Sequence, residues 1–386
     1  MRFLSSQTAA RVIATGACLL ATSIAHAQGG AQDAPLMSDQ FFKNIQVLKG
    51  LPVNEFMATM GFFSASLGYS CENCHSGNSW EEYIADTNPK KRMARGMVAI
   101  VNNINKNFFG GRQIVTCYSC HRGGEFPRTT PDLTNLYSPP NEEPEDVVKP
   151  GSGGLAADRI LDKYIQALGS AQRLAGLTSL VARGTSIGYN LDSDKNPVEI
   201  YAKAPNQRAT FIHTLAGDSV TTFDGRNGWL AGPQIAGPGI KVPVLSVAGS
   251  DVDGARFDAE MSFPGRVKQL ATQWRAGSPT EIGDQEVNVV QGNTAGGVLI
   301  TLYFDTETGL LARSVRYTTS PVGRIPTRVD YSDYRDVAGV KMPFKWTVTW
   351  LDGRETFEMT EMHANTAVDP AKFAKPVDTP AIPAAR

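Results

Sequence analysis

The pattern Cys-x-x-Cys-His occurs twice in this chain, at residues 71–75 and 117–121. Two thiols three positions apart lie on one helical turn and can form thioethers with the two vinyl groups of one haem. The histidine that follows projects onto the iron from the same side. The sequence therefore predicts two covalently bound haem c groups. The attachment residues are Cys71, Cys74, Cys117 and Cys120, and the axial histidines are His75 and His121.

The remaining cysteine fits this interpretation. Of the five cysteines, only Cys18 lies outside the two motifs, and it falls within an N-terminal export signal. No other thiol is left to form a disulfide. A zinc site built from both pairs, or a redox dithiol, is the alternative, but a zinc site gives no role to the histidine that directly follows each pair.

Each motif follows a stretch with helical patterning. The first stretch runs from Pro52 to Gly68, and the second runs from Asn88-Pro89 to Gly110-Gly111. Proline favours the first turn of a helix, asparagine its cap and glycine its end. Each stretch has an apolar stripe that includes methionine. The stripes are Phe56, Met60, Phe63 and Leu67, and then Met93, Met97, Ile100, Ile104 and Phe108.

These methionines are candidates for the sixth iron ligand. We expect Met60 at the first haem and Met97 at the second, because thioether and imidazole form a known axial pair. Met57 lies off the first stripe, whereas Met93 shares the face of Met97. Packing in the core is the alternative for each methionine. The only histidines outside the motifs and the signal are His213 and His363.

Residues 1–27 read as a signal peptide. Arg2 and Arg11 precede a short apolar run, and Ala25-His26-Ala27 offers a small-x-small cleavage site. The run is shorter than the roughly 20 residues that a spanning helix needs. An uncleaved anchor, or lipoprotein cleavage at Cys18, is the alternative. We therefore expect a periplasmic protein with no transmembrane segment in the mature chain.

Composition divides the 386 residues into two domains. We expect a dihaem domain over 28–125, a linker rich in Pro, Gly and acidic residues over 126–154, and a second domain over 155–386. The formal net charge of −1 and the lack of a long basic tract exclude nucleic acid as an expected partner.

The second domain begins with an amphipathic helix over 156–168, which ends at Gly169. Strand patterns separated by turn residues follow, with no crossover helix between them, so the sheet is predicted to be mostly antiparallel. The fold class is therefore a mainly α dihaem domain followed by an α+β domain with a curled antiparallel sheet. The strand candidates are 198–201, 220–223, 299–304, 346–350 and 355–359.

Residues 44–124 resemble a haem unit of the photosynthetic reaction centre cytochrome c subunit family. The segments that carry the resemblance are Asn44–Lys49, the methionine helices and Val115–Gly123. The resemblance implies that each haem takes a methionine from the helix before its motif, which places the ligands at Met60 and, through Arg95–Ile100, at Met97. Photosynthetic members typically carry four haems, whereas this chain has two motifs.

The second domain more loosely resembles the curled sheets of lipoprotein-carrier-like proteins, through its opening helix, its strand succession and residues 330–344. Such sheets can enclose an apolar cavity.

These features predict a carrier of single electrons between redox partner proteins, not an enzyme. A peroxidase-like haem enzyme with one open iron is an alternative. Another is that the β domain binds an apolar ligand, a lipid or a partner.

Overall fold

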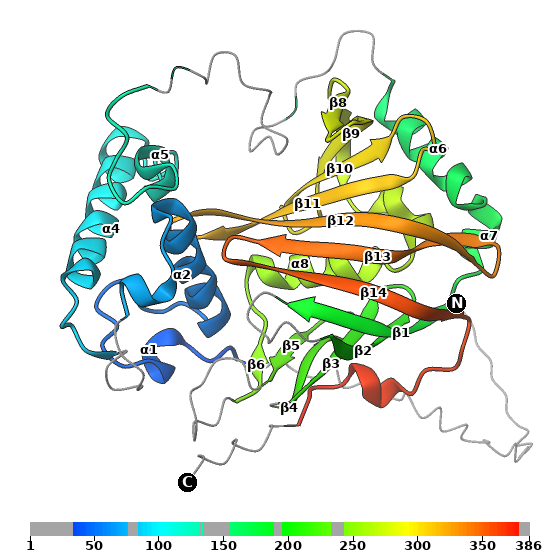
Figure 1. Cartoon of the computed structure of the whole chain (residues 1–386), viewed down its shortest axis with the longest axis horizontal. Coiled ribbons are helices and arrows are strands. Elements are labelled where there is room, and N and C mark those ends of the chain that lie inside the picture. The colour runs from blue at the N-terminus through cyan, green and yellow to red at the C-terminus, as the bar shows by residue number, and fades with distance from the viewer. Residues whose placement is uncertain are drawn as a thin grey trace, which may run out of the picture. The chain divides into compact units, whose positions relative to one another are not determined.

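A computed structural model describes the chain in several stretches (Figure 1). They are residues 34–75, 84–131, 133, 148, 155–188, 195–215, 217–232 and 243–377. The predicted signal peptide and most of the predicted linker lie outside them.

The haem-motif region is helical, as the sequence predicts. Pro52 is the N-cap of the first long helix, and Gly68 ends it in the left-handed conformation. Asn88 caps the second, where its side chain accepts a hydrogen bond from the Lys90 backbone N–H at 3.0 Å. The helices are α1 (Ser38–Phe41), α2 (Val53–Leu67), η1 (Cys71–Asn73), α4 (Pro89–Phe108) and α5 (Cys117–His121).

The second region contains helices and a large sheet. Its helices are α6 (Ala157–Leu168), α7 (Ala171–Ala175), α8 (Ser250–Glu260), η2 (Pro264–Gln269) and η3 (Pro370–Phe373). The first strands are β1 (Ser179–Gly188), β2 (Asn196–Lys203), β3 (Gln207–Thr214), β4 (Gly217–Phe223), β5 (Gly228–Ala231), β6 (Leu245–Ser246) and β7 (Thr272–Ala276). The others are β8 (Thr280–Ile282), β9 (Gln285–Asn293), β10 (Leu299–Asp305), β11 (Leu311–Ser320), β12 (Gly323–Val337), β13 (Val340–Trp350) and β14 (Gly353–Ala364).

All strand pairs among the described residues are antiparallel, and most join neighbours in sequence. The order is β6-β5-β4-β3-β2-β1-β14-β13-β12-β11-β10-β9-β7, and β8 pairs with β9. Two meanders therefore meet where β1 pairs with β14, with Leu180 opposite Ala364. The predicted fold class is confirmed: helices come first, then an antiparallel sheet opened by a helix.

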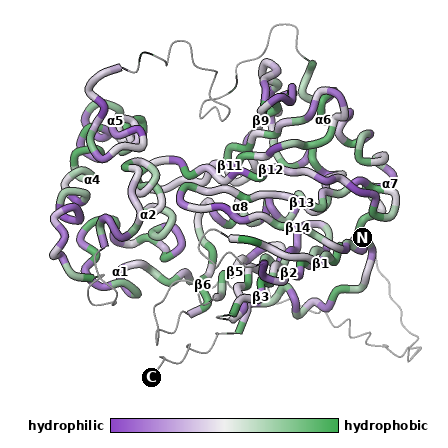
Figure 2. The backbone as a smooth tube through the Cα atoms, in the orientation of Figure 1, coloured by the Kyte–Doolittle hydropathy of each residue, from purple (hydrophilic) through white to green (hydrophobic). Residues whose placement is uncertain are grey.

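The main core lies between one face of the sheet and helices α6, α8 and η2. Leu161 of α6 and Ile300 and Leu302 of β10 are fully buried there. Hydrophobic residues (green in Figure 2) recur along α6 and the strands. On β2 and β10 every second side chain enters this core: Val198, Ile200 and Ala202, and Ile300, Leu302 and Phe304.

The haem-motif helices lie beside the ends of the long strands, where the β11–β12 and β13–β14 hairpins turn (Figure 1). Phe62 of α2 packs with Val322 and Ile325, and Cys117 and Leu351 join this cluster. The fit is close, because a Cβ added at Gly323 would lie 2.5 Å from the Phe62 ring. Apolar contacts thus connect α2 and the second motif to the sheet.

No helix within the described stretches is both long enough and apolar enough to cross a bilayer.

Candidate haem sites and the sheet cavity

The second motif forms the short helix α5. Thr116 caps it by accepting a hydrogen bond from the Ser119 backbone N–H. His121 ends the helix with only 8% of its surface exposed, and its Nδ1 lies 3.1 Å from the Gly124 carbonyl oxygen. A ring nitrogen facing a carbonyl must donate, so Nδ1 carries the proton and Nε2 keeps its lone pair. Such a histidine is oriented and in the right tautomer to bind iron.

The first motif begins in η1. The Ser70 backbone N–H donates to Oδ1 of Asn73 at 2.8 Å, which holds the tight turn. Asn88 ties this turn to the start of α4, since its side-chain amide donates to the Asn73 carbonyl at 2.9 Å. Cys71 is exposed, whereas Cys74 and His75 are half-buried. Each cysteine pair therefore opens toward the surface, where a large group can be attached.

Asn105 is a site residue that the sequence reading missed. It is buried on α4, where its Oδ1 accepts from the Ile114 and Val115 backbone N–H groups at 3.1 and 2.9 Å, and its Nδ2 donates to the Val115 carbonyl at 2.7 Å. It thereby fixes the loop that leads into Cys117. The available signal was a polar residue next to the apolar stripe, just before the glycine stop.

The end of α2 is built against the turn after the second motif. The Gly123 backbone N–H donates to the Ser66 carbonyl at 3.0 Å. Gly68 has φ +67°, and a Cβ there would lie 2.4 Å from the Gly123 carbonyl oxygen. Only glycine fits both the backbone conformation and the space. The end of α2 and the second motif segment are therefore one packed unit.

The apolar stripe of α4 is largely exposed in the polypeptide. The exposed fractions are 64% for Met93, 37% for Met97, 52% for Ile100 and 76% for Phe108. Helix α4 also packs against α5, the helix of the second motif. An exposed apolar stripe on a helix that packs against this motif fits the flat apolar body of a haem. Met60 on α2 is half-buried, and Met57 is 39% exposed.

Burial raises the pKa of one thiol in each pair, Cys74 and Cys117. It therefore favours the protonated thiol at these two positions. Within the described residues, no three side chains of His, Cys, Asp or Glu come together as they would around a metal ion.

The histidines of the second region lie far along the chain on the surface of the sheet. His213 pairs with Asp218 at 2.8 Å, and His363 with Glu361 at 3.4 Å. Both side chains are exposed, by 40% and 58%. The carboxylate partner of each histidine accounts for its position on the surface.

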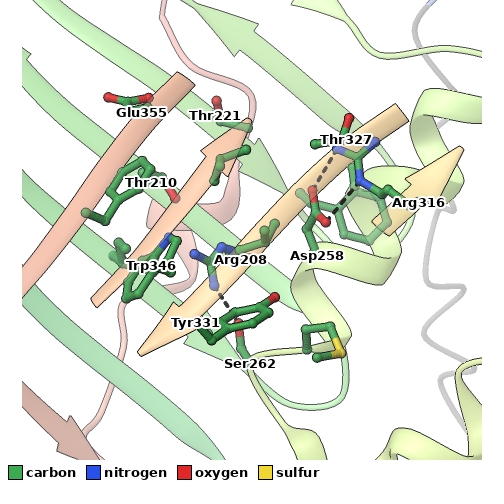
Figure 3. Close-up of a pocket in the computed structure, with 18 of the residues that line it drawn as sticks. Arg208, Thr210, Thr221, Asp258, Ser262, Arg316, Thr327, Tyr331, Trp346 and Glu355 are labelled. Atoms are coloured by element: carbon green, nitrogen blue, oxygen red, sulfur yellow. Dashed lines mark hydrogen bonds and ion pairs between the residues drawn. The ribbon is translucent and has the colours of Figure 1, made fainter. Parts of the chain in front are cut away.

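A cavity of about 600 Å³ lies between the sheet and helices α2 and α8. Most of its lining is apolar, but Arg208, Asp258 and Arg316 also face it (Figure 3). The sequence reading anticipated an apolar cavity but missed these charges. On β3, Arg208, Thr210 and Ile212 occupy every second position and all face the cavity. The two-residue period of a strand was therefore the signal available in the sequence.

The helical N-terminal region is similar in sequence to a known protein family. Residues 6–145 match the family described as "Photosynthetic reaction centre cytochrome C subunit". The N-terminal region is like the cytochrome c subunit of photosynthetic reaction centres. The subunit from Thermochromatium tepidum is 33% identical over 95 residues, which cover 24% of this chain and 23% of that protein. The subunit from Roseobacter denitrificans is 31% identical over 98 residues, covering 24% and 26%.

The chain thus spans about a quarter of the length of these cytochrome subunits. The predicted resemblance of residues 44–124 to this family is confirmed.

The sheet region is similar to solved structures of another kind. A domain from Vibrio parahaemolyticus, described as an outer membrane lipoprotein-sorting protein domain, superposes with a TM-score of 0.39 at 10% identity, covering 57% of this chain and 97% of that one. A LolA superfamily protein from Nitrosomonas europaea gives 0.36 at 12% identity, covering 57% and 99%.

Proposed function

We propose that this protein is a periplasmic dihaem c-type cytochrome that carries single electrons between redox partner proteins. Its domains would be a dihaem domain over 28–125 and a β domain over 155–386, joined by the linker 126–154, after removal of a signal peptide over 1–27. The observation that carries the proposal is a Cys-x-x-Cys-His helix whose histidine has Nε2 free, packed against helix α4, which has an exposed apolar stripe.

The chain's own residues hold the two haems. Cys71 and Cys74 would form the thioethers of the first group, and Cys117 and Cys120 those of the second. His75 and His121 would supply the imidazole ligands of the two irons, and Met60 and Met97 would supply the thioether ligands. Bound in this way, haem supplies reversible one-electron chemistry whose potential is raised by methionine ligation. The Gly124 carbonyl fixes the orientation of the His121 ring.

Mass measurement tests the covalent haems. The mature protein, produced in a host that matures c-type cytochromes, should show two haems by intact mass and by the pyridine haemochrome assay. A mass equal to that of the polypeptide alone would refute the proposal.

Spectroscopy separates the carrier from a haem enzyme. We expect a methionine-to-ferric-haem charge-transfer band from both haems in near-infrared magnetic circular dichroism, and no carbon monoxide binding to the reduced protein at neutral pH. Carbon monoxide binding at one haem, with peroxide turnover, would favour the peroxidase-like alternative.

A second role is favoured by the cavity of about 600 Å³, whose size is within the range of small-molecule sites. The β domain would bind an apolar ligand there. Native mass spectrometry for a co-purifying lipid tests this role, and protein that stays ligand-free after incubation with lipid would contradict it.

A further inference from the structure

The cavity is bounded by both regions of the chain. Strands β1–β4 and β11–β14 supply apolar residues, α8 supplies Asp258, and Asn54 and Ala58 come from α2. Trp346 of β13 lies along one side (Figure 3). A chain of methylene groups would find apolar surface on several sides, which is the main driving force for binding an acyl chain.

Arg208 places a positive charge inside this apolar space. Its Nη1 donates to Oγ of Ser262 at 2.7 Å, and this neutral hydroxyl is the hydrogen-bond partner that the structure gives it. A guanidinium carries five N–H donors. Burial lowers the pKa of Arg208, but arginine stays charged in proteins. The nearby Asp258 carboxylate favours the charged form, but its hydrogen bonds are with Arg316. The buried guanidinium of Arg208 therefore has N–H donors left for a second anion.

The other charges of the cavity have partners of their own or are weakened. Arg316 binds Asp258 through two parallel hydrogen bonds of 3.1 and 3.0 Å. Asp251 accepts from the Asn54 amide at 2.7 Å, and burial raises its pKa. Burial also raises the pKa of Glu355, which lies apart from Arg208 in Figure 3. Lys341 and Asp352 also line the cavity, but both residues are exposed to solvent. Arg208 is therefore the cation of the inner wall that remains available to an incoming ligand.

We propose that this cavity binds a single-chain amphiphile with a monoanionic head, in which the head pairs with Arg208 and the chain lies against Trp346 and the inner face of the sheet. This rests on the proposed apolar-ligand role of the β domain and adds the charge of the ligand. A carboxylate and a phosphate monoanion share the required chemistry, since both can accept two parallel N–H donors from a guanidinium.

The test uses the haem-loaded full chain and two fluorescent probes, a polyene fatty acid and its methyl ester. We expect the acid to bind at least about tenfold more tightly than the ester, because only the acid forms a charge-assisted pair. Equal affinities would overturn the proposal while leaving the apolar-ligand role intact. Binding of neither probe would overturn both.

Variants locate the site. Arg208→Gln should weaken binding of the acid at least about tenfold and leave the ester unchanged. Arg183→Gln is the matched control, because Arg183 is exposed on β1 and pairs with Glu199 and Glu361 outside the cavity. Thr210→Trp, which fills the cavity, should abolish binding of both probes. An unchanged acid affinity in a folded Arg208→Gln protein would refute the assignment.

Competition identifies the source of the head group. Displacement of the acid probe by palmitate points to a free fatty acid, and displacement by lysophosphatidylglycerol points to a phospholipid. Displacement by neither, in protein that binds the probe, would overturn the proposal. A haemochrome assay on the same protein keeps this result separate from the haem count.

Discussion

Helix α4 of the haem-motif region and helix α6 of the sheet region both carry an apolar stripe, but protein covers only the stripe of α6. Ile160 and Leu161 of α6 are 3% and 0% exposed. Ile100 and Phe108 of α4 are 52% and 76% exposed. Among the described residues, the sheet region closes its own core, whereas α4 of the haem-motif region keeps an exposed apolar stripe. The proposed haems would explain this difference, because they would cover the stripe.

The strongest test of this comparison removes the attachment points. Cys117→Ala/Cys120→Ala should lower the intact mass by one haem and destabilise the region around α4, because the stripe would lose its cover. The sheet region should unfold as in the wild type, as followed by the fluorescence of its tryptophans. The matched pair Cys71→Ala/Cys74→Ala should also lose one haem. Retention of two covalent haems in either variant would contradict the assignment.

A matched pair of isoleucine truncations compares the two stripes directly. Ile160→Ala should lower the free energy of unfolding of the sheet region by about 3 kcal/mol, as for a buried isoleucine. Ile100→Ala should cost about 1–2 kcal/mol in the haem-loaded protein, because a covering haem would bury it. Denaturant titration, followed by tryptophan fluorescence and by haem absorbance, measures both.

Leu215, which is 94% exposed in the β3–β4 turn, is the control for this pair. Leu215→Ala should change stability by less than about 0.5 kcal/mol. If Ile100→Ala behaves like Leu215→Ala, the α4 stripe is plain surface and the comparison fails.

Local signals predicted much of both regions. Pro52, Gly68 and Asn88 mark helix ends in the sequence, and each lies at the predicted end because caps depend on neighbouring residues only. The strand candidates 346–350 and 355–359, separated by turn residues, lie in β13 and β14 for the same reason.

Features that depend on residues far apart in the chain could not be predicted from the sequence. The pairing of β1 with β14 joins residues more than 150 positions apart, and no local pattern encodes it. Arg208 faces a cavity only because strands β1–β5 and β11–β14 and helix α8 assemble around it. The stripe of α4 was visible in the sequence, but whether protein or haem covers it depends on the fold. The haem ligands Met60 and Met97 therefore stay predictions.

Two glycines with positive φ separate conformational strain from close packing. Gly68 has φ +67° and would place a Cβ against the Gly123 carbonyl, whereas Gly110 has φ +61° and open space around it. Gly68→Ala should destabilise the haem-motif region by about 2 kcal/mol, and Gly110→Ala by about 1 kcal/mol. Thermal unfolding followed by haem absorbance measures the difference. Equal losses would mean that α2 and the second motif segment do not form one packed unit.

The smallest expected effect is a pH dependence. Hydrogen bonds from Arg95, at 3.0 and 2.8 Å, lower the pKa of Asp86 to about 2. Because the folded pKa lies below the ordinary value of 3.8, the pair stabilises the haem-motif region above about pH 4, and this contribution is lost as the pH falls toward 2. Asp86 is partly exposed, so the contribution should be less than about 1 kcal/mol.

Asp86→Asn should therefore lower stability at pH 7 and converge with the wild type near pH 2. In the sheet region, Lys345 and Lys195 likewise lower the pKa of Glu358 to about 2. Glu358→Gln should show the same pH window in tryptophan fluorescence and none in haem absorbance. A response of both probes to either variant would mean that the two regions unfold as one unit. The contacts of Phe62 with Val322 and Ile325 connect the two regions and would explain that outcome.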